Sequence, residues 1–168
     1  MSMLMSVYAL TEADLARVLA EPGLVHALLD CEPGARAAAA LPRRECALDR
    51  AWQAIHFVLT GELDGDGTGP LGFLLGGGAD VGDLDLGYGP ARAFRASEVA
   101  AIAQELGPVS PEVFAARLDH GAMVDEGIYG VGDDEDEDRE YILGAFQELR
   151  AFVLAAVEAR EGLIVALV

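Results

Sequence analysis

His56 is the side chain in this sequence best suited to acid–base chemistry. Residues 48–61 have helical periodicity, and His56 shares one face with four apolar side chains, Leu48, Trp52, Ile55 and Leu59. A partly buried imidazole beside a carboxylate could act as a general base. Asp49 lies nominally on the same face but about two helical turns away, too far for direct contact. The alternative is a structural histidine satisfied by a carbonyl or a water.

A second set of candidates surrounds the rigid turn Gly89–Pro90. Tyr88 and Arg92 flank this turn and could donate hydrogen bonds to an anionic ligand. Equally, Arg92 could be paired with the plentiful carboxylates, with Tyr88 packed beside it. His120 and Tyr129 would belong to the same site only if the fold brings them there. The candidate binding residues are therefore His56, Tyr88, Arg92, Asp49, Trp52, Tyr129 and His120.

One acidic loop partly resembles a calcium-binding loop. Oxygen-bearing residues occupy its first, third and fifth positions as Asp64, Asp66 and Thr68, and Gly69 follows at the sixth. A bidentate glutamate is required at position twelve, where this chain has Leu75. A second flanking helix is not apparent either. We therefore interpret the segment as a glycine-rich turn, with a calcium-responsive module as the weaker alternative.

Several common catalytic and cofactor motifs are missing from the sequence. A phosphate-binding Walker loop needs a lysine, and the chain has none. None of the four serines sits in a Gly-x-Ser-x-Gly elbow, and the three histidines lack metal-ligand spacing. Cys31 and Cys46 form no Cys-x-x-Cys pair and are expected to be reduced thiols. We expect no cofactor and no metal.

The strongest global feature is charge. Twenty-nine acidic residues oppose eleven basic ones, all of them arginine, for a formal net charge of −18. Such a surface repels phosphate backbones and anionic lipids, so nucleic acid and membrane surfaces are excluded as partners. Acidity of this kind most often serves solubility, and it also suits a basic protein partner. No apolar run approaches the ~18 residues of a membrane span, and no signal peptide is evident, so we expect a cytoplasmic protein.

Four strands are expected from short apolar runs. They cover residues 3–9, 71–75, 91–96 and 163–168. The last run is apolar without interruption, which predicts a strand buried on both faces in the middle of a sheet.

Helices are expected to cover most of the remaining chain. Thr11 and Ser110 are predicted N-caps, with Pro111 in the first helical position, and Ser97 is predicted to cap another helix. Residues 121–132 are interpreted as a linker, and the acidic run 133–138 as a solvated helix entry. The predicted helices follow Thr11 and Ser97 and cover 24–30, 35–41, 48–61, 111–119 and 139–160.

These elements predict a single α+β domain over residues 1–168. Its helices and strands do not alternate regularly, and the strands lie far apart in sequence. We therefore expect a small mixed sheet of three or four strands covered by about six helices.

An ordered set of short segments resembles a known family. It includes the Leu-Asp-Arg-Ala-Trp-x-x-Ile-His-Phe-x-Leu-Thr-Gly pattern at 48–61, Pro-Leu…Leu-Gly-Gly at 70–77, and Tyr88 to Arg92. Ser97-Glu98-Val99, Ile128-Tyr129 and the closing helix and strand complete the set. The chain thus resembles the YfbM-like bacterial family, a domain of unknown function. The resemblance implies a cytosolic α+β domain and no particular reaction.

Two positions depart from the pattern of that family. Gln53 stands where a second histidine is common, which weakens any paired-histidine site. Gly130 and the acidic run follow Ile128-Tyr129, where the family usually has a proline and then a tryptophan. If that loop borders a site, the site in this protein differs.

Two classes of function fit these observations. The leading hypothesis is a non-catalytic binding domain that engages a basic partner, in the manner of small acidic immunity proteins. The alternative is a hydrolase or transferase with His56 as the base and Tyr88 and Arg92 binding an anionic group. That alternative requires His56 and Arg92 to open into one shared pocket.

Overall fold

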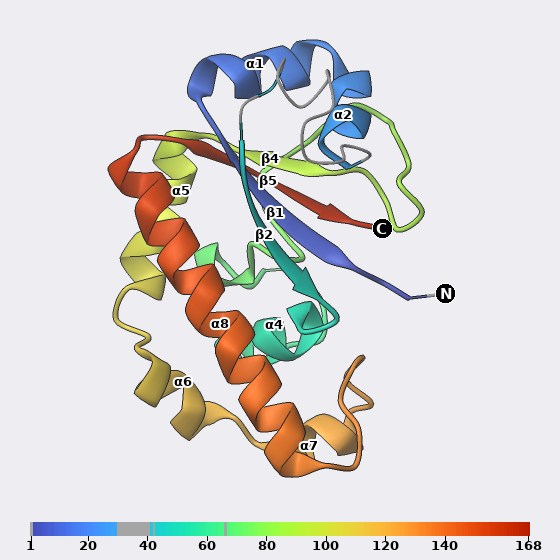
Figure 1. The fold of residues 1–168 in the computed structure, drawn as a ribbon, viewed down its shortest axis with the longest axis vertical. Coiled ribbons are helices and arrows are strands. Elements are labelled where there is room, and N and C mark those ends of the chain that lie inside the picture. Colours follow the sequence, from blue (N-terminus) through green and yellow to red (C-terminus); the bar gives the residue numbers. More distant parts are fainter. Residues whose placement is uncertain (1, 30–40, 42, 66) are drawn as a thin grey trace.

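A five-stranded antiparallel sheet forms the centre of the protein (Figure 1). The computed structural model describes residues 2–29, 41, 43–65 and 67–168. The strands lie in the order β2-β1-β5-β4-β3. Their bounds are Met5–Leu10 for β1, Arg44–Asp49 for β2, Ala79–Asp80 for β3, Arg92–Phe94 for β4 and Gly162–Leu167 for β5.

The C-terminal strand β5 is the middle strand, as its continuous apolar sequence predicted. Leu163 and Val165 point into the core on one face, and Ile164 and Ala166 into the core on the other. All four side chains are almost completely buried. A strand with apolar residues at every position is stable only where both faces are covered, which explains its place in the sheet.

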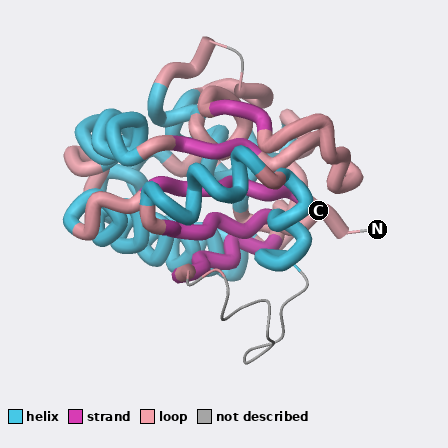
Figure 2. The backbone as a smooth tube through the Cα atoms, turned by 90° about the horizontal axis from the view of Figure 1, so that it is seen from above, coloured by secondary structure: helices cyan, strands magenta, loops and turns pink. Residues whose placement is uncertain are grey.

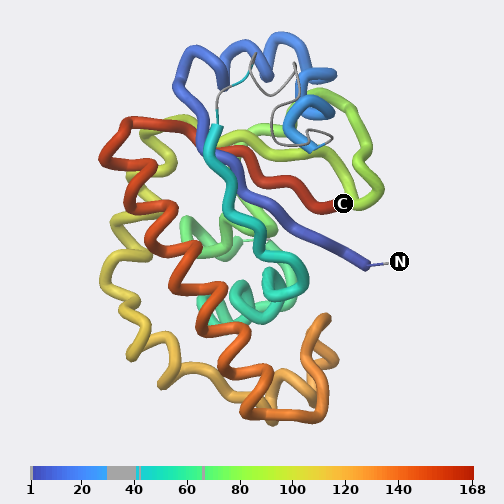
Figure 3. The backbone as a smooth tube through the Cα atoms, in the orientation of Figure 1, coloured from blue at the N-terminus to red at the C-terminus, as the bar shows by residue number. Residues whose placement is uncertain are grey.

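Helices cover both faces of this sheet, giving three layers (Figures 1 and 2). The smaller core lies under α1 (Glu12–Ala20), the short turn η1 (Pro22–Leu24) and α2 (Val25–Leu29). The larger core lies under α4 (Trp52–Thr60), α5 (Ala96–Leu106), α6 (Pro111–Arg117) and α8 (Glu135–Glu158), with α7 (His120–Asp125) against α8. The two ends of the described chain lie side by side where the paired strands β1 and β5 end, and Leu4 and Val168 exchange backbone hydrogen bonds there (Figure 3). No described helix has the length and apolar character needed to cross a bilayer.

The helix caps follow the sequence at two positions and differ at a third. The hydroxyl groups of Thr11 and Ser110 accept from backbone N–H groups three residues ahead, as predicted. Ser97 is not an N-cap, which corrects the prediction. The helix begins at Ala96 with Arg95 as its N-cap, two residues earlier than predicted, and the carboxylate of Glu98 accepts from the N–H of Arg95 at 2.7 Å.

The segment 44–49 is a strand that the sequence analysis missed. Cys46 and Leu48 are buried while their neighbours are exposed, which is the two-residue period of a half-covered strand. Leu48 therefore belongs to β2, and the helix carrying His56 begins only at Trp52. The predicted helix at 35–41 lies outside the described residues except for Leu41.

The predicted strand at 71–75 is wrong. Its backbone makes local bonds instead, from Gly72 N to Gly69 O and from Leu75 N to Gly72 O, around the turn η2 (Pro70–Gly72). Apolar side chains alone do not separate a buried turn from a strand. With β2 and β3 added, the sheet has five antiparallel strands, rather than three or four in a mixed arrangement.

One helix is longer than predicted, and a segment predicted to be a linker contains most of another helix. The helix α8 starts at Glu135, not Arg139, because Asp134 caps it by accepting from Glu137 N at 3.0 Å. Its acidic first turn is favoured by the helix dipole. The expected linker at 121–132 contains most of α7, which Asp119 caps by accepting from Ala122 N.

Residues 61–78 form a glycine-rich segment, and two of its arms cross at a distance that only glycine permits. A Cβ atom at Gly65 would lie 2.3 Å from the carbonyl carbon of Leu75. A Cβ atom at Gly76 would lie 2.3 Å from the carbonyl oxygen of Gly65. The two backbones therefore pack directly on each other, and the side chains around them are positioned by this crossing.

Replacing Gly76 with alanine tests the crossing. Because the new Cβ atom meets backbone, we expect a loss of about 2–3 kcal/mol in the free energy of unfolding. Gly144→Ala is the matched control, since a Cβ atom there meets nothing within 4 Å. Alanine in that helix interior should stabilise by roughly 0.5–1 kcal/mol. Urea unfolding followed by circular dichroism measures both, and an unchanged midpoint for Gly76→Ala would contradict the crossing.

Candidate functional site

His56 is completely buried in α4 and holds the start of the glycine-rich segment. Its side chain is 0 % exposed, and Nε2 lies 2.7 Å from the carbonyl oxygen of Asp64. A carbonyl accepts, so Nε2 carries the proton, and Nδ1 has no partner among the described residues. Burial is the main cause that lowers the pKa of His56. The imidazole is therefore neutral at neutral pH and out of reach of a solute.

Arg92 holds the other end of the glycine-rich segment. Its Nη1 donates to the carbonyls of Gly76 and Gly77, and its Nη2 donates to the carbonyl of Leu74. Desolvation lowers the pKa of Arg92 to about 10, with Asp80 acting in the opposite direction, so the side chain stays charged at neutral pH. These terminal N–H groups are thus used for backbone carbonyls rather than for an anionic ligand.

The catalytic hypothesis required an open pocket shared by His56 and Arg92. Arg92 does line a small cavity of about 80 Å³, together with Tyr88, which is 43 % exposed. His56 is not among the residues lining that cavity. The described part of the chain therefore lacks the geometry on which that hypothesis depends.

Trp52 and Tyr129 fasten the N-terminal segment to the core. Their ring centroids lie 6.1 Å apart at an interplanar angle of 32°. The indole N–H of Trp52 donates to the carbonyl of Met3, and the N–H of Met3 donates to the Tyr129 hydroxyl. Gln53 accepts from the N–H of Tyr129 at 2.7 Å. The residue that departs from the family pattern thus has a structural partner.

His120 joins α7 to the start of α8. Its Nε2 lies 2.9 Å from a carboxylate oxygen of Asp138, and that oxygen also accepts from the N–H of Gly132 at 2.8 Å. The acidic run therefore contains a carboxylate with two partners inside the fold, and not only solvated groups.

The calcium-like loop does not continue into a second helix. The Thr68 hydroxyl donates to the carbonyl of Gly65 at 2.9 Å, and the turn η2 follows. Asp66 lies outside the described residues, as does Cys31. Within the described ranges, no group of three His, Cys, Asp or Glu side chains is arranged to hold a metal ion.

Two hollows lie beside α8: one of about 280 Å³ between this helix and β2, and one of about 420 Å³ at the end of β2, lined also by Leu4, Arg50 and Gly130. Asp49 and Tyr141 line both hollows and so form the boundary that the two hollows share. We call the pair the acidic groove, because its charged lining is Asp49, Glu137, Asp138, Glu140 and Glu148, with Arg50 as its basic member. Asp49 was a sequence candidate, and His120 pairs with one of the other lining carboxylates.

Tyr141 is the exposed aromatic residue of the acidic groove. It is 39 % exposed, and its hydroxyl lies 3.4 Å from the backbone N–H of Arg50. Nearby, burial, followed by the charges of Glu148 and Glu45, raises the pKa of the Cys46 thiol to about 11. Glu148 of the groove is thus close enough to act on the Cys46 thiol, with burial as the larger effect.

The acidic groove also follows the free edge of the sheet. β2 pairs with β1 on one side, and no described strand pairs with it on the other. Gly144 contributes no side chain, and a Cβ atom there would meet nothing within 4 Å. The groove therefore combines open space with the edge of a strand.

Sequence reasoning missed Tyr141, Glu140 and Glu148, although their spacing contained a signal. Tyr141 follows Glu137 by four residues, and Glu148 follows Gly144 by four, so these residues share a side of α8. That side is distinct from the apolar stripe used to predict the helix. What the spacing could not show is that β2 lies opposite it.

These observations define an acidic α+β domain with an antiparallel sheet and an open groove at its edge. The chain belongs to the family described as a domain of unknown function, DUF1877, whose profile matches residues 1–166. The resemblance found in the sequence is thereby confirmed. The crystal structure of YfbM from Escherichia coli, a protein of unknown function, is similar, with a TM-score of 0.70 and 16% identity over 98% of this chain and 99% of YfbM. None of the curated proteins matches the sequence.

The burial of His56 predicts a pH-dependent stability. Because the pKa is lowered in the folded protein, the unfolded chain binds a proton more readily below about pH 6.5. The contribution of neutral His56 is complete above that pH and is lost as the pH falls, by at most about 1.4 kcal/mol per unit.

His56→Gln keeps a donor for the Asp64 carbonyl and cannot titrate. We therefore expect the unfolding free energy of the wild type to fall relative to this variant between about pH 7 and 5. Urea titrations of both proteins at several pH values measure the difference in unfolding free energy. Taking this difference cancels the pH dependence of the carboxylates, which the two proteins share. A difference independent of pH would contradict the buried, neutral state.

Proposed function

We propose that this protein is a non-catalytic binding domain whose acidic groove receives a basic, extended segment of a partner protein. The observation that carries the proposal is the position of Tyr141 between two hollows with mainly carboxylate charges, beside the unpaired edge of β2. The groove offers a partner charge, an aromatic face and backbone hydrogen-bonding groups in one place.

The side chains of the acidic groove favour arginine or lysine in the partner. A cation over an exposed tyrosine ring gains about 0.5–1 kcal/mol, and flanking carboxylates add ion pairs. Five lining carboxylates oppose a single lining arginine, Arg50. The net charge of −18 extends this preference to the encounter, because it attracts basic partners from a distance and repels acidic ones.

The edge of β2 supports an extended partner rather than a helical one. An unpaired strand presents N–H and C=O groups that another strand can satisfy. Ala47 is exposed at the centre of β2 and lines the groove, so little side-chain bulk stands beside that edge. A segment with alternating basic residues would direct every second side chain toward α8.

The binding interpretation is favoured over catalysis by the positions of His56 and Arg92. The imidazole is fully buried, and the guanidinium donates to three carbonyls of its own chain. A cytoplasmic location is part of the same proposal, and the buried free thiol of Cys46 is compatible with it.

A labelled peptide in which arginine and valine alternate tests the proposal. We expect fluorescence anisotropy to detect binding that weakens as salt rises from about 50 to about 300 mM. Glu140→Gln combined with Glu148→Gln should weaken binding about tenfold. Tyr141→Leu should weaken it about two- to fivefold, because the cation–π contact is lost, whereas Tyr141→Phe should not.

The matched control removes two charges elsewhere. Asp83→Asn combined with Glu105→Gln also removes two negative charges, at exposed positions outside the acidic groove. We expect this pair to change the affinity less than twofold. Equal weakening by both double variants would show that only the overall charge matters and would overturn the proposal. An alternating glutamate–valine peptide that binds as well would overturn it too.

A further inference from the structure

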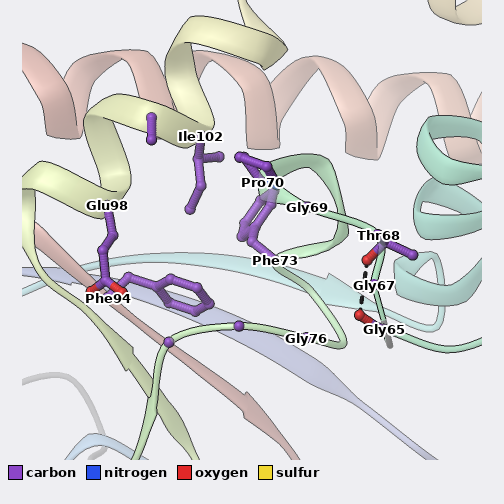
Figure 4. A pocket seen from close by; sticks show the side chains of 13 residues that line it. Gly65, Gly67, Thr68, Gly69, Pro70, Phe73, Gly76, Phe94, Glu98 and Ile102 are labelled. Atoms are coloured by element: carbon purple, nitrogen blue, oxygen red, sulfur yellow. Dashed lines mark hydrogen bonds between the residues drawn. The ribbon is translucent and has the colours of Figure 1, made fainter.

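A separate cavity of about 350 Å³ lies between the glycine-rich segment and α5 (Figure 4). It shares no lining residue with the acidic groove. Its volume is in the range of small-molecule sites in proteins. Neither the sequence candidates nor the proposed protein-binding function makes use of it.

The side chains that line this cavity are mainly apolar, and the largest of them are almost completely buried, so each presents only a small part of its surface to the space. Ile102 from α5 and Phe73 from the glycine-rich segment are turned toward the same space as Phe94 of β4 (Figure 4). The rings of Phe73 and Phe94 meet edge to face, with centroids 6.3 Å apart and an interplanar angle of 85°. Such a wall suits a compact apolar or aromatic body.

Of the described residues that line the cavity, Glu98 is the one that is ionisable, and it is exposed at the start of α5. Figure 4 shows its carboxylate at the edge of the cavity, next to Phe94. Oε2 accepts from the N–H of Arg95 at 2.7 Å, and this bond fixes the side chain at the start of α5. Oε1 has no partner among the described residues and can accept from a ligand.

The cavity is held open by the backbone rather than by flexible side chains. Arg92 ties the carbonyls of Leu74, Gly76 and Gly77 to β4, and the crossing of Gly65 with Gly76 fixes the opposite arm. Six glycines line the space, so few side chains can fill it: Gly65, Gly67, Gly69, Gly76, Gly77 and Gly78. The structure therefore has a preformed site, which lowers the cost of ordering on binding.

From this arrangement we infer that the cavity binds a small amine, with its apolar body against Phe73, Phe94 and Ile102 and its ammonium group at Glu98. An ammonium group supplies the donors that Oε1 can accept and the opposite charge. An anionic ligand of the same shape meets the Glu98 carboxylate and the net charge of −18, so it is disfavoured. This inference does not depend on the acidic groove.

Tryptamine and indole-3-propionate are matched probes, because they share a ring and differ in the sign of their charge. At physiological salt we expect isothermal titration calorimetry to give tryptamine at least tenfold higher affinity for the wild-type protein. Glu98→Gln keeps an acceptor for the N–H of Arg95 while removing the charge. It should weaken tryptamine about five- to tenfold and remove most of the discrimination, whereas Glu105→Gln should leave both unchanged.

A steric pair of variants locates the ligand. Ala101 lines the cavity, and Ala100, also exposed on α5, does not. Ala101→Phe should reduce tryptamine binding at least tenfold, and Ala100→Phe less than twofold, with thermal unfolding used to confirm that both variants fold. The inference is overturned if tryptamine gives no binding, if indole-3-propionate binds equally well, or if the two phenylalanine variants behave alike.

Discussion

The partly buried guanidinium of Arg92 is the constraint on which the least regular part of the molecule depends. β4, a strand of only three residues, carries Arg92 next to three consecutive glycines, Gly76 to Gly78, which have no side chains to pack. Because these glycines cannot be anchored in the core as Phe73 and Leu74 are, the guanidinium binds the backbone carbonyls at this end of the segment. Loss of water around the guanidinium lowers its pKa to about 10 but leaves it charged at neutral pH. The shape of the adjacent cavity follows from that attachment.

Other arginines of this protein have a similar task. Arg139 donates to the carbonyls of Ala115 and Leu118 at the end of α6, and Arg150 donates to the carbonyl of Gly107 at the end of α5. Cations at helix C-termini satisfy carbonyls that lack a partner within the helix. Within the described ranges, none of these three arginines forms an ion pair with a carboxylate. The acidic surface is therefore a consequence of where the few cations are used, as well as of their number.

Local pattern in the sequence identified chemically capable residues, but not the place in the fold to which each belongs. Asp49 and His120 were named as candidates for a site with His56 and Arg92, whereas in the structure they lie at or beside the acidic groove. Tyr141 was missed because its importance comes from β2 on the opposite side. His56 and Arg92 were identified as chemically capable residues, but their partners are carbonyls of a loop whose path no spacing rule describes. The chemistry that a side chain can perform follows from its residue type, whereas its accessibility to a ligand depends on tertiary packing.

The sequence by itself determined the α+β class, the net charge, the central position of β5 and the caps of α1 and α6. Each of these follows from composition or from contacts within a few residues. Only the tertiary structure decided that every strand pair is antiparallel, that 44–49 is an edge strand and that 71–75 is a turn. Those features depend on pairing between distant segments, which local propensity does not encode because the same apolar run is stable in more than one setting.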